Sequence, residues 1–239
     1  MPMIIRAAGV GFLAALPLLL GTWFALRRRP SDRTIGLVAA FGAGALISAV
    51  SFELVLDAVE RGNPWALALC LALGAVTYYA GDRYLSHRKR ASAANARGLA
   101  LLMGAALDGI PESFILGISV AAGAGVSVPF FVAVVLSNLP EGMASAAELS
   151  GESGYADRRI LLMWSVVVGV SALAAGLGAL VAGAGAATSA GAQAFAAGAL
   201  LTMLTDDLVP EARERGGITA GLAAVFGFAV AFALHQLGA

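Results

Sequence analysis

The chain has 239 residues, of which 59% are hydrophobic and only 13% are charged, and its mean hydropathy is +0.86. A soluble domain is about half apolar and about one quarter charged, so water cannot be the solvent for most of this surface. The formal net charge of zero gives no reason to expect a nucleic-acid partner, and the single cysteine, Cys70, excludes an intramolecular disulfide and a cysteine-rich metal site.

The sequence contains eight apolar runs, each near the length of about 20 residues that a membrane-spanning helix needs. These runs are residues 4–26, 34–58, 64–85, 98–122, 128–149, 159–183, 192–210 and 218–237. Because they are continuous rather than alternating, helices are favoured over a β-barrel. The first run ends in three arginines and is interpreted as a span, with a cleaved signal peptide as the alternative. We therefore predict an all-α polytopic membrane protein with eight transmembrane helices in a single domain, residues 1–239.

Basic residues predict the orientation of these helices. The loops between spans 1 and 2, 3 and 4, 5 and 6, and 7 and 8 hold 13 of the 15 lysines and arginines. All four loops fall on one side of the predicted bundle, which is therefore expected to be cytoplasmic. Both termini would then be extracytoplasmic, in a multi-pass protein of the cell (plasma) membrane.

An internal repeat relates span 2 to span 7. Residues 40–62 and 194–216 are identical at 12 of 23 positions, at a constant offset of 154. The matched positions include charges, such as Glu53 with Asp207 and Asp57 with Glu211. Because five spans would separate span 2 from span 7, the two copies would run in opposite directions. This pattern predicts an inverted repeat of spans 1–3 against spans 6–8, with spans 4 and 5 central.

Spans 4 and 5 carry related polar motifs. Asp108 and Glu112 are four residues apart in span 4, and Ser137 and Glu141 have the same spacing in span 5, with Asn138 beside Ser137. Residues four apart share a helix face. A carboxylate at bilayer depth costs at least about 2.5–3.5 kcal/mol, which a bound divalent cation would offset most directly. The alternatives are a proton relay and a network of hydrogen bonds between helices.

A proline precedes each of these glutamates, Pro111 before Glu112 and Pro140 before Glu141. Proline removes one helical hydrogen bond and frees the carbonyl four residues earlier, here that of Leu107 or Leu136. A freed carbonyl is tolerated at membrane depth where it lines a cavity or is buried in protein, and it could serve as a hard oxygen ligand.

Further carboxylates lie toward the predicted ends of the spanning helices, on both sides of the central motifs. We expect an acidic outer mouth and an acidic inner exit, with ordinary interfacial charge as the alternative for each residue. The outer mouth would contain Glu53 and Asp57, and the inner exit would contain Glu148, Asp206, Asp207 and Glu211. His87 and His235 are interpreted as incidental. Interfacial anchoring is expected of Trp23, Trp65, Tyr78, Tyr79 and Tyr84.

The eight spans, the inverted repeat and the paired Pro-Glu motifs resemble those of the ZIP (Zrt/Irt-like protein) metal transporters of the bacterial type. The family's two central motifs look like His-Asn-x-Pro-Glu-Gly. Span 5 here keeps Asn138-x-Pro140-Glu141-Gly142, span 4 keeps Pro111-Glu112, and span 7 ends in Leu208-Val209-Pro210-Glu211-Ala212. This resemblance implies transport of a divalent metal cation into the cytoplasm, with no enzymatic activity. It assigns the metal ligands to Asp108, Glu112, Ser137, Asn138 and Glu141.

Three departures from the family pattern bear on the cargo. Asp108 and Ser137 stand where the family usually has histidines, span 6 lacks the Glu-Pro that many members have, and only His87 lies in the loop between spans 3 and 4. Zinc is the family default as the metal substrate, but carboxylate and carbonyl donors suit harder ions such as manganese, magnesium or calcium. Manganese, iron and cadmium stay open as substrates beside zinc. The alternative function is a metal-binding membrane sensor or a non-transporting homologue, and a homodimer is also open. A proton-coupled carrier of an organic solute lacks a membrane-depth Lys or Arg to pair with an anion.

Overall fold

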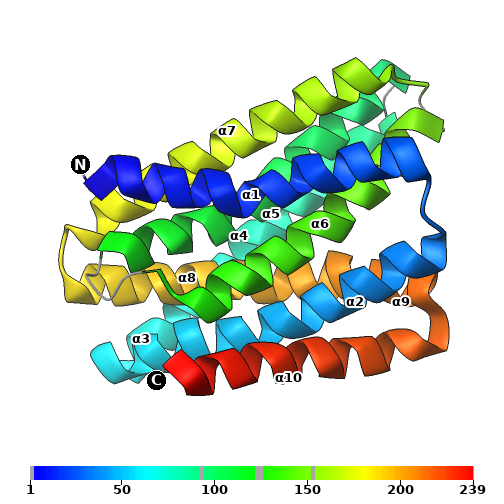
Figure 1. Cartoon of the computed structure of the whole chain (residues 1–239). Helices are drawn as coiled ribbons and strands as arrows, with labels where there is room; N and C mark the ends of the chain where they lie inside the picture. The colour runs from blue at the N-terminus through cyan, green and yellow to red at the C-terminus, as the bar shows by residue number, and fades with distance from the viewer. Residues whose placement is uncertain (1–2, 92–93, 122–125, 152–153, 239) are drawn as a thin grey trace.

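A computed structural model describes residues 3–91, 94–121, 126–151 and 154–238, and every regular element in these ranges is a helix. The elements, in chain order, are α1 (Met3–Arg28), α2 (Asp32–Ala49), η1 (Val50–Leu56), α3 (Asp57–Arg61), α4 (Pro64–Ala91), α5 (Ala94–Ala121), α6 (Val128–Gly151), α7 (Asp157–Ala182), α8 (Ala186–Met203), η2 (Leu204–Leu208), α9 (Val209–Gly216), η3 (Gly217–Thr219) and α10 (Ala220–Gly238). The first turn of α1 and the last turn of α10 lie at the same end of the bundle (Figure 1).

By length and composition, the described residues contain seven helices that could cross a membrane. The last is the 53-residue stretch Ala186–Gly238, in which the chain reverses direction after Gly217, a residue with a φ of 68° (Figure 1). A left-handed φ of this kind is characteristic of glycine. The structure thus confirms the predicted all-helical class and fits a polytopic membrane protein.

Large apolar side chains cover the outside of the bundle, as expected where lipid replaces water. Leu73, Val76, Leu173, Leu222 and Phe226 are all more than half exposed. So many exposed large apolar side chains are unusual on a soluble monomer.

The predicted edges differ most between spans 3 and 4. α4 continues to Ala91 and α5 begins at Ala94, so most of the stretch expected to be a basic loop is helical. Arg, Lys and Ala are strong helix formers. The charges of Arg and Lys end an apolar run without ending a helix. Residues 92 and 93 of this predicted loop lie outside the described residues.

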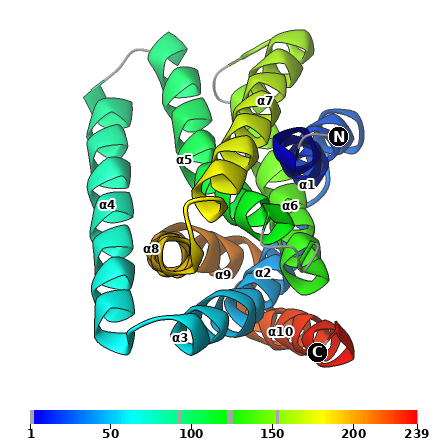
Figure 2. The ribbon, with the colours of Figure 1, turned by 90° about the vertical axis from the view of Figure 1, so that its left-hand side faces the viewer.

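The helices form two sets of close neighbours. The first set is α1, α5, α6 and α7. The second set consists of two pairs, α2 with α10 and α4 with α8, which meet where α8 contacts η1. The view along the bundle shows α8 and α9 between α4 and the α2–α10 pair, with α5 and α6 on the opposite side of α8 from α3 (Figure 2). α6 also contacts α2, so the motif of α6 lies where the two sets meet.

Glycines set the distance between the paired helices. A Cβ on Gly44 of α2 would lie 1.8 Å from the Ala224 carbonyl oxygen of α10, and one on Gly198 of α8 would lie 1.9 Å from the Leu71 carbonyl oxygen of α4. Neither position has room for a side chain. Gly44 and Gly198 are 154 residues apart, the offset found in the sequence.

The same helix pairs make a second matched contact. A Cβ on Gly227 of α10 would lie 1.9 Å from the Phe41 carbonyl oxygen, and one on Gly74 of α4 would lie 1.8 Å from the Phe195 carbonyl oxygen. Phe41 and Phe195 are again 154 residues apart. The packing of α2 on α10 therefore repeats in the packing of α8 on α4.

A π-helical segment interrupts each member of the related pair. η1 begins at Val50 and η2 begins at Leu204, which are equivalent positions in the two repeats. Widened turns of this kind occur frequently at functional sites. Each segment carries one of the matched carboxylates, Glu53 in η1 and Asp207 in η2.

Candidate metal centre

The two Pro-Glu helices meet through one hydrogen bond. The Ser137 hydroxyl of α6 lies 3.3 Å from Glu112 Oε1 of α5 and 3.0 Å from the Val134 carbonyl oxygen. Glu112 and Ser137 are each only 3% exposed. The buried Glu112 carboxylate therefore faces Ser137 of the second motif, which lies 25 residues further along the sequence.

Asn138 is oriented by α1 and keeps one oxygen free of hydrogen bonds. Its Nδ2 donates to the Ala14 carbonyl at 2.9 Å, which directs the amide group. The Asn138 side chain is 3% exposed, and its Oδ1 has no hydrogen-bond partner among the described residues. Buried polar atoms are nearly always paired, so an unpaired amide oxygen marks a place for a missing donor or cation.

Asp108 has a partner that the sequence did not indicate. The Tyr78 hydroxyl of α4 donates a hydrogen bond to Asp108 Oδ1 and lies 2.7 Å from Asp207 Oδ2 of η2. Asp207 was expected at an inner exit, but this contact brings it beside Asp108. Tyr78 is 3% exposed, so its interpretation as an interfacial anchor is wrong.

Glu141 completes an acidic centre. The carboxyl groups of Asp108, Glu112, Glu211 and Asp207 are all near enough to the Glu141 carboxyl to interact with it electrostatically. These groups come from α5, α6, η2 and α9, elements that are far apart along the chain. Mutual repulsion among such groups in a low-dielectric interior favours the entry of a cation.

One of the two carbonyls freed by proline is covered by a neighbouring helix. A Cβ on Gly42 of α2 would lie 2.8 Å from the Leu136 carbonyl oxygen, so the α2 backbone passes directly over it. A larger residue at position 42 would push α2 away from the motif of α6.

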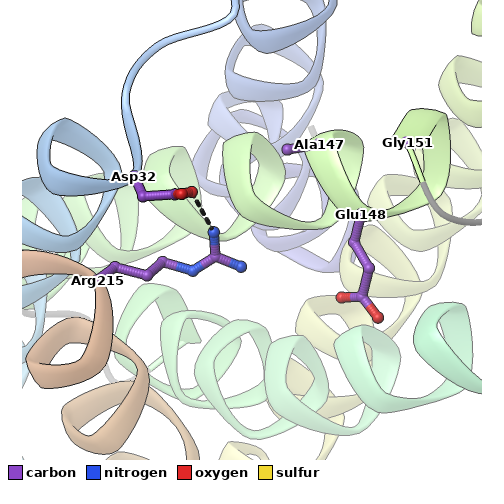
Figure 3. A pocket seen from close by; sticks show the side chains of 5 residues that line it. All are labelled: Asp32, Ala147, Glu148, Gly151 and Arg215. Carbon is purple, nitrogen blue, oxygen red and sulfur yellow. Dashed lines mark hydrogen bonds and ion pairs between the residues drawn. The ribbon is translucent and has the colours of Figure 1, made fainter.

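Of the four carboxylates predicted for an inner exit, Glu148 lines a pocket at the end of the bundle where α2 begins and α6 ends (Figure 3). The pocket is lined by Asp32, Ala147, Glu148, Gly151 and Arg215. Arg215 pairs with Asp32 at 3.0 Å and with Glu211 at 2.9 Å, whereas the exposed Glu148 lies across the pocket from it (Figure 3). Asp206 is exposed and is not among the residues that line the pocket.

At the opposite end, Glu53 holds two other segments. Its Oε1 lies 2.6 Å from His235 Nδ1 of α10, and its Oε2 accepts from the Ser127 hydroxyl at 2.6 Å. The His235 ring also stacks on Phe52 with centroids 5.3 Å apart. His235, which was not expected to be a ligand, thus has a structural contact with Glu53. We call Glu53 a clamp because it links η1 to α10 and to the segment that precedes α6. Asp57 lies one turn further along and is partly buried.

Sequence patterns offered little help in finding Tyr78 and His235. Each makes its contact with a carboxylate at least 30 positions away in the sequence. The internal repeat relates the two contacts, because Glu53 and Asp207 occupy equivalent positions. Asp207 contacts Tyr78 of α4, which packs along α8, and Glu53 contacts His235 of α10, which packs along α2.

The candidate ligands are not assembled into a metal cage. Among the described residues, no three His, Cys, Asp or Glu side chains are close enough together to hold a metal ion. The predicted ligand set also includes Ser137 and Asn138, whose side-chain oxygens are neutral. Compared with known proteins, the chain matches no protein-family model and no curated sequence.

Proposed function

We propose that this protein moves a divalent metal cation across the plasma membrane into the cytoplasm, as a variant member of the ZIP family. The observation that carries the proposal is the contact of Ser137 with Glu112, beside the unpaired Oδ1 of Asn138. Buried oxygens from two proline-containing helices provide hard donors close to one another, and no cationic side chain is among their hydrogen-bond partners in the described residues.

We also propose eight spans. The stretch Ala186–Gly238 would be about 80 Å long as one straight helix, far more than a bilayer core of about 30 Å. The reversal at Gly217 supports counting α8–α9 and α10 as separate crossings. The matched glycine contacts and the matched π-helical segments support the inverted repeat, with α5 and α6 central.

The proposed path runs from the centre to the inner pocket. Glu211 lies within electrostatic range of both Glu141 and Glu148, and Glu148 lines the pocket, so carboxylates connect the centre with the pocket. We take this end to be cytoplasmic because the predicted basic loops favour that orientation. Glu53, closed off by His235 and Ser127, is a clamp at the outer end in this conformation. Rocking of one helix set against the other would expose the centre to each side in turn.

Oxygen-rich donors leave the cargo open among zinc, manganese, iron and cadmium, with zinc as the family default. The decisive test is uptake of each ion by purified protein in proteoliposomes. Glu112→Ala and Glu141→Ala are each expected to abolish uptake. Glu214→Ala, at an exposed position on α9, is the matched control and should retain it. Unchanged uptake in both central variants would overturn the proposal.

A second candidate is a membrane sensor that binds metal without moving it. It is favoured by Asp108 and Ser137 in place of histidines and by the hydrogen bond that already occupies Asp108. Saturable cation binding to the detergent-solubilised protein, with no flux in proteoliposomes, would support the sensor and exclude the transporter.

A further inference from the structure

Tyr78 contacts two carboxylates from two different elements. Its hydroxyl donates to Asp108 of α5 and lies 2.7 Å from Asp207 of η2, while its ring is part of the buried core. Phenol has a single proton to donate. The hydroxyl therefore donates to only one of the two carboxylates at a time, although both lie within hydrogen-bond distance of it.

We propose that Tyr78 is a positioning residue that competes with the cation for the Asp108 carboxylate. This inference rests on the proposed function, because it assumes that Asp108 is a cation ligand. In the cation-free protein the hydroxyl stabilises Asp108. A cation that takes the Asp108 oxygen displaces this hydrogen bond, and the hydroxyl then donates to Asp207 alone.

The competition keeps the cation from binding too tightly. A carrier must release its cargo, and a site of clustered carboxylates alone would hold a divalent ion strongly. The hydroxyl lowers the free energy of the empty site, so the difference between the empty and occupied sites is smaller. Tyr78 also connects α4, α5 and η2. When its hydroxyl changes acceptor from Asp108 to Asp207, occupancy of the cation site is therefore coupled to the π-helical segment η2.

The variant Tyr78→Phe removes only the hydroxyl oxygen. It should lower the Kd for the transported cation about tenfold, equivalent to about 1.4 kcal/mol, because the empty site loses its hydrogen bond and its two carboxylates repel. In proteoliposomes the half-saturating concentration should fall while the maximal rate also falls, since release becomes slower. A merely structural residue would not lower both together.

Tyr79→Phe is the matched control. Tyr79 is the next residue of α4, is 50% exposed, and its hydroxyl accepts from Arg83 rather than contacting a carboxylate of the centre. Its Kd and its rate should equal those of the wild-type protein. A Kd for Tyr78→Phe that equals or exceeds the wild-type value would overturn the inference, whereas absence of wild-type uptake with binding retained would overturn only the proposed transport.

A second measurement does not depend on the folding of Tyr78→Phe. The chain has four tyrosines, so replacing Tyr79, Tyr84 and Tyr155 by Phe leaves Tyr78 as the sole tyrosine. Its ring C–O infrared band should shift when cation is added to the solubilised protein, because the hydroxyl changes its acceptor. A band that does not move while the cation binds would overturn the inference, and a wild-type protein that binds no cation would overturn both proposals.

Discussion

Ser137 of α6 lies within hydrogen-bond distance of Glu112 of α5, and this 3.3 Å contact joins two motifs that each combine a proline with a glutamate. Neither residue is more than 3% exposed. The contact makes position 137 the most direct place to change the chemistry of the centre without altering the carboxylates.

Ser137→His should shift the preference of the site toward zinc over manganese. Imidazole suits zinc, whereas hydroxyl and carboxylate oxygens suit harder ions. We expect the ratio of zinc to manganese uptake to rise several-fold in competition assays, and Asp108→His to act in the same direction. Ser150→His, at the exposed end of α6, is the control. An unchanged ratio in both central variants would show that positions 108 and 137 do not contact the cation.

Asn138→Ala should reduce uptake strongly and lower the free energy of unfolding by about 1 kcal/mol, because the hydrogen bond to the Ala14 carbonyl is lost. Thr22→Val is a matched control, since the Thr22 hydroxyl donates to the Gly142 carbonyl at 3.2 Å and so also links α1 with α6. Thr22→Val should cost similar stability and keep its uptake. Equal loss of uptake in both variants would show that Asn138 acts only through packing.

Gly44→Ala and Gly198→Ala should each destabilise the protein by about 1–3 kcal/mol or more, since overpacking forces the paired helices apart. An added Cβ would lie within 2 Å of a carbonyl oxygen in both cases. Thermal unfolding in detergent measures the effect. Gly221→Ala is the control, because a Cβ there meets no atom within 4 Å. Midpoints of Gly44→Ala and Gly198→Ala that match the control would contradict the close packing of these helices.

Glu53→Gln tests whether the outer carboxylate is a clamp or a ligand. Glutamine can still accept from Ser127, but the charge facing His235 is lost. If Glu53 is a clamp, Glu53→Gln should lower the unfolding midpoint slightly and leave the half-saturating cation concentration near the wild-type value. A large rise in that concentration with unchanged stability would instead support the predicted role at an outer mouth.

Added cation should stabilise the folded protein if the centre binds it. Binding at 100 times the Kd stabilises a folded state by about 2.7 kcal/mol, so the unfolding midpoint should rise with the logarithm of cation concentration. The double variant Glu112→Gln, Glu141→Gln should show no such rise, and a chelator should reverse the wild-type shift. A midpoint that is insensitive to all four candidate ions would argue against the centre.

The sequence by itself determined the helical class and the candidate polar motifs. Apolar runs must match the thickness of a bilayer, so their length and continuity predict spanning helices without tertiary information. A spacing of four residues places Asp108 with Glu112, and Ser137 with Glu141, on one helix face. The offset of 154 residues likewise predicted which segments are related, and the π-helical segments begin at positions with that offset.

Only the tertiary structure decided which partner each carboxylate has. Tyr78 lies 30 residues from Asp108 and 129 from Asp207, and His235 lies 182 residues from Glu53. Contacts at such separations depend on how the helices are turned and how closely their glycines let them approach. No local pattern encodes that geometry, because each helix presents its polar residue to an element from a distant part of the chain.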